Sequence, residues 1–281
     1  MLERLLDVLR CPVCGGSLQR VGASLRCAER HTFDIARQGY VNLLGGGAHP
    51  ATGDTADMVQ ARAEFLDAGH FAPLARALAD DAAEVPGDVV LDAGAGTGYY
   101  LGAVLDERTG GRGLALDVSK AASRRAARAH ERAGAAVWDS WQPLPVRDRS
   151  VDLVLDVFAP RNGPEFRRIL RPGGAVLVVT PQQTHLAEVA EIAGMLSVDP
   201  DKDERLERSL TVHLDLDGRR ELAWPMSLWR SDVARLVRMG PSAWHVDATT
   251  LASRLATIPE PVQVTAAVVL SRFRRPDREP L

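Results

Sequence analysis

The chain has 281 residues and carries 34 Lys and Arg against 37 Asp and Glu, for a net charge of −3 at pH 7. This near balance excludes a strongly basic protein, so net charge alone does not indicate a nucleic-acid binder. The length favours one large core plus a smaller accessory module. No stretch is long and apolar enough to span a membrane, and charges spread over residues 1–10 argue against a signal peptide, so we expect a cytoplasmic protein.

The N-terminal part contains all three cysteines of the chain. Two residues separate Cys11 from Cys14, and three separate Cys27 from His31. Two close pairs of soft ligands suit tetrahedral Zn²⁺, whereas three cysteines are an odd number for a disulfide framework. The alternative, three buried thiols and an unrelated histidine, is disfavoured by both pair spacings. Four protein ligands leave no open coordination position, so we predict one structural zinc ion.

This zinc ion is expected to stabilise a module, residues 1–46, that is too small to build its own core. The module is locally positive, because it holds six arginines and four acids (Arg4, Arg10, Arg20, Arg26, Arg30, Arg37; Glu3, Asp7, Glu29, Asp34). Residues 45–47, all glycine, mark a linker. Apolar residues at helical spacing then predict a helical connector within residues 47–85.

Residues 86–281 are expected to form an α/β domain. The predicted strands are residues 89–93, 113–117, 135–138, 151–158 and 175–180, with a turn at 170–174 and helices at 99–107 and from Ser119 to about 132. Apolar strands that alternate with helices indicate a parallel sheet covered on both faces. The predicted fold class is therefore α/β, a doubly wound Rossmann-like domain with its ligand at the carboxyl ends of the strands.

A glycine-rich turn between the first of these strands and its helix predicts the ligand. Its residues are Asp92, Gly94, Gly96, Thr97 and Gly98, in the pattern D-x-G-x-G-x-G. The dinucleotide pattern G-x-G-x-x-G does not fit, because the third glycine comes one residue early. An ordinary tight turn is the alternative, but the surrounding strand–helix order favours a turn that binds S-adenosylmethionine (SAM). Asp117, at the end of the next strand, is placed to bind the ribose hydroxyls.

Several segments together resemble one enzyme family, the bacterial 23S rRNA (guanine-N1)-methyltransferases. They are residues 27–44, 61–62, 65–71, 116–120, 157–162, 168–174, 179–183 and 185–186. The last four segments, 157–162, 168–174, 179–183 and 185–186, are most similar to the Gram-positive branch, which includes the tylosin and mycinamicin resistance methyltransferases. The resemblance covers nearly the whole chain in the same order.

The resemblance implies a zinc-ribbon-like RNA-recognition module joined to a SAM-dependent methyltransferase domain, in a homodimer. It implies methylation of N1 of a guanine in hairpin thirty-five of 23S rRNA, as free RNA or in a large-subunit assembly intermediate, and resistance to tylosin-type macrolides. By position it adds Phe71, a tyrosine in many members, and His185 to the SAM contacts. Arg30, Arg37 and Arg161 become candidate RNA contacts, through phosphates and RNA shape.

The sequence leaves the catalytic residues open. Guanine N1 carries a proton at neutral pH, so a base should assist methyl transfer. Asp156 and Asp139 are possible bases, and Asn162 could hydrogen-bond the guanine edge, but for any single one of them the role of a strand-end cap or a solvated loop residue is favoured.

Two other function classes stay open at this point. One is a SAM-dependent enzyme acting on a small molecule, which the zinc module argues against. The other is a non-catalytic RNA-binding or assembly protein, which the intact glycine turn argues against.

Overall fold

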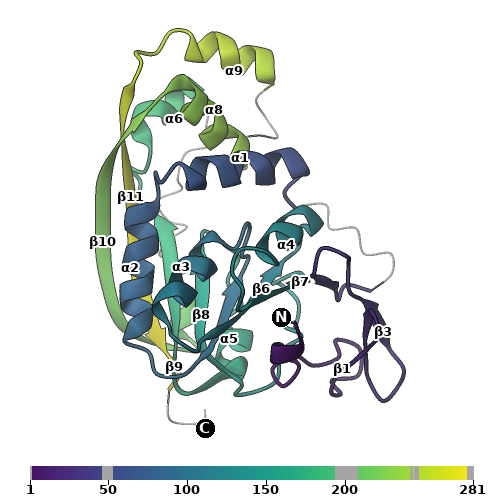
Figure 1. Cartoon of the computed structure of the whole chain (residues 1–281). Helices are drawn as coiled ribbons and strands as arrows, with labels where there is room; N and C mark the ends of the chain where they lie inside the picture. Colours follow the sequence, from purple (N-terminus) through teal and green to yellow (C-terminus); the bar gives the residue numbers. More distant parts are fainter. Residues whose placement is uncertain (1, 46–52, 194–207, 241–242, 244–246, 277–281) are drawn as a thin grey trace.

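A computed structural model describes residues 2–45, 53–193, 208–240, 243 and 247–276 (Figure 1). Its central sheet has eight strands in the order β10-β11-β9-β8-β5-β6-β7-β4. Their bounds are β4 Val41–Asn42, β5 Val89–Ala93, β6 Arg112–Asp117, β7 Ala133–Val137, β8 Val151–Val157, β9 Leu170–Pro181, β10 Asp215–Leu228 and β11 Val262–Arg274. The strands from β4 to β9 pair in parallel, whereas β11 and β10 add to β9 in antiparallel. The predicted Rossmann-like fold class is confirmed.

Helices cover this sheet as the alternation of segments predicts. They are α2 (Ala72–Ala83), α3 (Tyr99–Glu107), α4 (Lys120–Ala126) and α5 (Gly163–Ile169). The bounds of α3 are those predicted, and Ser119 caps α4 by accepting the N–H of Ala122. The prediction that α4 continues to about residue 132 is wrong. After α4 the backbone forms hydrogen bonds between residues three apart, from Arg128 N–H to Arg125 O and from Ala129 N–H to Ala126 O, as in a 3₁₀ turn. The next strand, β7, then begins at Ala133.

Two further strand boundaries differ from the prediction. The third predicted strand, β7, begins two residues earlier and ends one residue earlier than predicted, because Ala133 already pairs with Gly113 of β6. The predicted turn at 170–174 is the first part of β9, because Leu170 pairs with Val151. Gly173 within it has a φ of 76°, so the strand carries an irregular bend where a turn was predicted.

A second layer covers the carboxyl ends of the parallel strands (Figure 1). It contains α1 (Ala56–Asp67), α6 (Ala187–Ala193), α8 (Arg230–Met239) and α9 (Ala248–Leu255). Phe65 and Leu66 of α1 share a buried cluster with Leu236 and Val237 of α8. This contact forms a roof over the end of the sheet where Rossmann-like domains bind ligands. None of the helices in the described ranges is long and apolar enough to cross a membrane.

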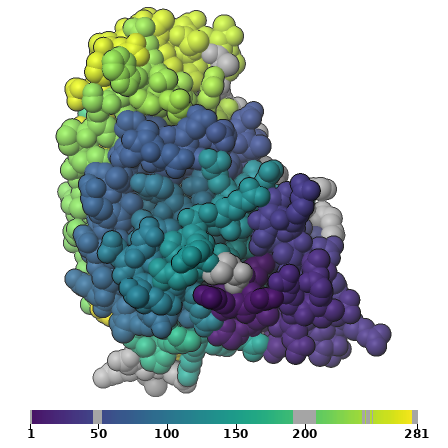
Figure 2. Space-filling view, viewed as in Figure 1, coloured from purple at the N-terminus to yellow at the C-terminus, as the bar shows by residue number. Residues whose placement is uncertain are grey.

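The N-terminal module lies beside the β7 edge of the sheet and projects from one side of the molecule (Figure 2). It consists of the short helix η1 (Leu2–Leu5), a three-stranded antiparallel sheet and β4; the three strands are β1 (Gln19–Val21), β2 (Ser24–Arg26) and β3 (Thr32–Asp34). Leu5 and Leu25 belong to the same buried cluster as Leu114 and Ala136 of the large domain. The module therefore obtains its core by sharing that of the domain. Of the predicted glycine linker, Gly46 and Gly47 lie outside the described residues.

Candidate metal centre and active site

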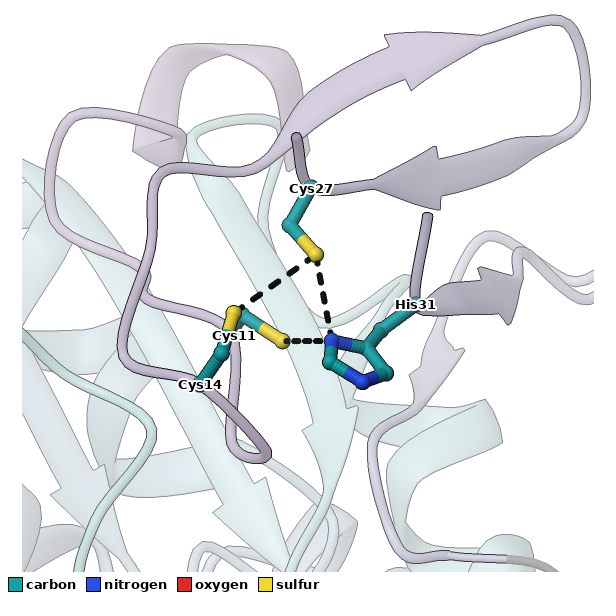
Figure 3. Close-up of side chains that lie close together, drawn as sticks. All are labelled: Cys11, Cys14, Cys27 and His31. Atoms are coloured by element: carbon teal, nitrogen blue, oxygen red, sulfur yellow. Dashed lines mark hydrogen bonds between the residues drawn. The ribbon is translucent and has the colours of Figure 1, made fainter. Parts of the chain in front are cut away.

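The four predicted metal ligands converge on one point (Figure 3). Their ligand atoms all lie within 4.8 Å of one another. The Sγ atoms of Cys14 and Cys27 are 3.7 Å apart, and Nδ1 of His31 lies 3.7 Å from Sγ of Cys11 and 3.3 Å from Sγ of Cys27. Zn–S bonds of about 2.3 Å place tetrahedral ligands about 3.8 Å apart. The geometry thus fits a closed tetrahedral zinc site.

Each ligand pair lies on a tight backbone turn. The N–H of Gly15 donates to the carbonyl of Cys11, and the N–H of Arg30 donates to the carbonyl of Cys27. Gly15 and Arg30 have φ values of 73° and 65°, the left-handed conformation that lets the chain fold back within a few residues. These turns bring both ligands of each pair to the same side of the backbone. No exchangeable coordination position remains, which fits a structural ion.

A cavity of about 970 Å³ lies between the carboxyl ends of the parallel strands and the helices α1 and α8. Of the predicted SAM contacts, it is lined by Phe71, Asp92, Gly94, Gly96, Thr97, Asp117 and His185. Gly98 is the exception: it forms the N-cap of α3 and faces a separate groove between α1, α3 and α4. A volume of this size accommodates a ligand the size of SAM together with part of an acceptor.

The glycine turn closes one end of this cavity. Gly94 has a φ of 77°, and a Cβ atom on it would lie 2.6 Å from the Cβ of Ala159, so only glycine fits. The N–H of Gly96 donates to Oδ2 of Asp117, and the N–H of Ser119 donates to Oδ1, both at 2.8 Å. These bonds hold the Asp117 carboxylate at the end of β6 while leaving lone pairs free for a ribose.

Asp92 is the buried acid of the glycine motif. Its Oδ2 has no hydrogen-bond partner among the described residues, and burial, reinforced by the nearby Asp117, raises the pKa of Asp92 to about 8. A buried carboxylate without a partner favours a cationic ligand group. The ammonium of SAM is such a group, so the residues present fit this donor.

Aromatic rings form the opposite wall. The ring of Phe71 lies 6.4 Å from that of Phe158 and 6.2 Å from that of His185, measured between centroids. Nδ1 of His185 accepts the N–H of Ala267 at 3.1 Å, and burial lowers the pKa of His185 to about 4. The imidazole is therefore neutral, with its proton on Nε2. Trp141, which is 65% exposed, also lines the cavity.

Comparison with known proteins places this arrangement in a family. Residues 9–46 match the zinc-ribbon model described as "RlmA, N-terminal", and residues 90–174 match a methyltransferase domain. The "23S rRNA (guanine(748)-N(1))-methyltransferase" of Streptomyces fradiae is 49% identical over 98% of this chain and 99% of its own length. A "Putative 23S rRNA (guanine-N(1)-)-methyltransferase" of Micromonospora griseorubida is 54% identical over 96% of this chain and 98% of its own.

The chain belongs to the 23S rRNA (guanine-N1)-methyltransferase family. It is a SAM-dependent methyltransferase with an N-terminal zinc ribbon. A Bacillus halodurans structure described as a "putative methyltransferase" matches the fold with a TM-score of 0.52 and 16% identity, over 72% of this chain and 98% of that one. Family membership agrees with the resemblance seen in the sequence.

In this methyltransferase the candidate catalytic residues separate into two places. Asp139 lines the cavity, whereas Asp156 is fully buried and does not. Both carboxylate oxygens of Asp156 lack a hydrogen bond within the described chain, burial raises its pKa well above the usual range, and Nε of Arg161 lies 3.6 Å from Oδ1. Asn162 donates through Nδ2 to the carbonyls of Ser140 and Gln142, and so holds the loop that carries Trp141.

The predicted RNA contacts also differ in position. Arg30 and Arg37 are exposed on the zinc ribbon. The side chain of Arg161 is only 6% exposed and is directed at Asp156.

Sequence reasoning did not single out several residues that line the cavity, among them Asp54, Arg62, Trp141 and Phe158. Arg62 and Phe158 were available within the family-like segments, as 61–62 and 157–162. Asp54 and Trp141 carried no signal, because only the packing of distant loops brings them to the cavity.

Proposed function

We propose that this methyltransferase transfers the methyl group of SAM to N1 of a guanine in hairpin thirty-five of 23S rRNA, and thereby gives resistance to tylosin-type macrolides. The observation that carries the proposal is the near-full-length relationship to the Streptomyces fradiae enzyme, whose name specifies guanine 748. It spans the zinc ribbon and the SAM cavity together. The relationship therefore supports both the RNA acceptor and the SAM site for this chain.

The aromatic end of the cavity supports a nucleobase as acceptor. Phe158 directly follows β8 and has a φ of 55°, a strained conformation for a non-glycine residue, and its N–H donates to Val179 O at 3.2 Å. Phe158 is 42% exposed and lines the cavity together with Trp141. Proteins recognise unstacked bases by stacking them on aromatic faces, and a base must leave its stack before it reacts. We infer that Phe158 and Trp141 hold the target guanine.

The chain's contribution to the chemistry is mainly alignment. SAM, when bound, supplies a methyl group already activated on a sulfonium, so the protein must place guanine N1 in line with it. His185 presents Nε2–H, a donor that cannot accept the N1 proton but can hydrogen-bond a carbonyl oxygen. Of the two carboxylates considered as bases, Asp139 lines the cavity, which supports it as the one that would contact the acceptor. One of its oxygens already accepts the N–H of Trp141 at 3.0 Å.

The zinc ribbon is proposed to hold the RNA around the target base. Its exposed arginines, with Arg30 and Arg37 the first candidates, would contact phosphates, which makes binding depend on salt concentration. We further propose that the enzyme is a cytoplasmic homodimer acting on free 23S rRNA or on an assembly intermediate of the large subunit.

A direct transfer assay tests the proposed acceptor. The full-length zinc-loaded protein is incubated with labelled SAM and, separately, with a synthetic hairpin thirty-five RNA or a tylosin-type macrolide. Label on the RNA is expected, and Gly96→Arg should abolish it because the larger side chain fills the donor end of the cavity. Label on the macrolide, with none on RNA, would indicate a small-molecule methyltransferase. RNA binding without any transfer would indicate a binding or assembly protein.

A further inference from the structure

The charged side chains that line the cavity are carboxylic acids, apart from one residue. Four aspartates line it, Asp54, Asp92, Asp117 and Asp139, and among the described lining residues Arg62 is the cationic one. His185 adds no charge near neutral pH, since burial lowers its pKa to about 4. SAM carries a carboxylate on its methionine part. A carboxylate entering a space lined by aspartates is repelled unless a cation meets it.

The guanidinium of Arg62 is held through one terminal nitrogen, so the other terminal nitrogen can still bind a ligand. The residue lies on α1, in the roof of the cavity, with its side chain 29% exposed. Nη2 contacts Oδ2 of Asp54 at 2.7 Å and donates to the carbonyl of Met239, at the end of α8, at 2.6 Å. Within the described parts of the chain, Nη1 has no hydrogen-bond partner. It lies 3.1 Å from the position that a Cβ atom on Gly96 would occupy.

We propose that Arg62 binds the carboxylate of SAM through Nη1. The guanidinium faces the glycine turn, and at the same turn the partnerless Asp92 fits the ammonium. The two residues would then recognise both charges of the amino-acid part. The proposal rests on SAM as the methyl donor and holds for any acceptor. An RNA phosphate is a second source of anionic oxygen, but the position of Arg62 beside the donor turn favours the carboxylate.

The test compares SAM with decarboxylated SAM, which lacks only the carboxylate. Dissociation constants are measured by calorimetry on the full-length zinc-loaded protein, without RNA. The native protein should bind SAM more tightly than the decarboxylated ligand by about 10- to 100-fold, the range for a charge-assisted hydrogen bond. Arg62→Gln should weaken SAM binding by a similar factor and leave the decarboxylated ligand within about two-fold. Arg62→Lys, which keeps the charge without the planar fork, should lie between the two.

A matched control separates recognition from packing of the roof. Arg235 on α8 contacts Glu64 of α1 at 2.9 Å but does not line the cavity. Arg235→Gln should therefore bind both ligands as the native protein does.

Four results would overturn the proposal. Equal affinity of the native protein for both ligands would mean that no residue recognises the carboxylate. Equal weakening of both ligands by Arg62→Gln, or the same loss in Arg235→Gln, would assign Arg62 to holding α8. Unchanged SAM affinity with weaker binding of the hairpin RNA would assign it to a phosphate. Because none of the SAM measurements uses RNA, they stand even if the proposed acceptor is wrong.

Discussion

The ring of Phe158 provides a quantitative test of the acceptor end of the cavity. Replacing it by leucine removes the aromatic face but keeps an apolar side chain of similar volume, so the fold should lose less than about 1.5 kcal/mol. Base–aromatic stacking contributes about 1–3 kcal/mol per base, which corresponds to a factor of about 5 to 150. Because Phe158 is 42% exposed and lines the cavity, this stacking energy is available to an acceptor.

The assay measures kcat/KM for the hairpin RNA and, separately, the dissociation constant of SAM. Phe158→Leu should lower kcat/KM by that factor and leave SAM affinity unchanged, whereas Phe158→Tyr, which keeps the ring, should stay close to the native enzyme. Trp229 is the control, because it is 56% exposed but does not line the cavity, so Trp229→Leu should have no effect.

Two outcomes would refute this reasoning. If Phe158→Leu keeps the native kcat/KM, the ring does not stack on the acceptor. If SAM affinity falls in parallel with kcat/KM, the ring belongs to the donor site.

Three further predictions concern the metal and the donor end. Chelation of zinc, or Cys14→Ser, should lower the melting temperature of the whole chain in calorimetry, because the ribbon shares its core with the large domain; an unchanged transition would contradict this. Gly94→Ala should abolish detectable SAM binding, since its Cβ would lie 2.6 Å from that of Ala159, while the circular dichroism spectrum of the variant should stay native-like. SAM affinity should rise with pH towards about 8, because the carboxyl of Asp92, whose pKa burial raises to about 8, must ionise to face the ammonium. Calorimetry at neutral pH should then detect the release of a proton when SAM binds to the native protein, and no such release when SAM binds to Asp92→Asn. A binding enthalpy that does not depend on the buffer would contradict this prediction.

The parts of the fold with strong local signals could be predicted from the sequence. Helix α3 follows a glycine turn and has the predicted bounds, and the strands β5 and β8 are mostly apolar and buried along their whole length. The zinc ligands were equally predictable from the sequence, because their spacing within each turn is a local property. The converging geometry of Cys11, Cys14, Cys27 and His31 confirms that the four residues form one cluster.

The C-terminal part was not predicted because its signals are weak. Most residues of β10 are exposed or half-buried, so the strand lacks the regular alternation of buried and exposed residues that identifies one. The helix α8 is recognisable as amphipathic, but its position over the cavity depends on packing against α1, some 170 residues earlier in the chain. Arg62 and Trp141 become cavity residues only through such distant contacts. Asp156 was predicted as a site residue from its position at a strand end, but its carboxylate is fully buried and does not line the cavity.

The measurement that tests the account most directly is nucleotide mapping of full-length 23S rRNA after methylation by the purified enzyme. RNA from a strain lacking hairpin thirty-five methylation is treated with enzyme and SAM, digested, and analysed by mass spectrometry. We predict one added methyl group, on N1 of a guanine in hairpin thirty-five, and none with Gly96→Arg. A methyl group on another atom or in another hairpin, or no methylation of RNA by a protein that binds SAM, would contradict it.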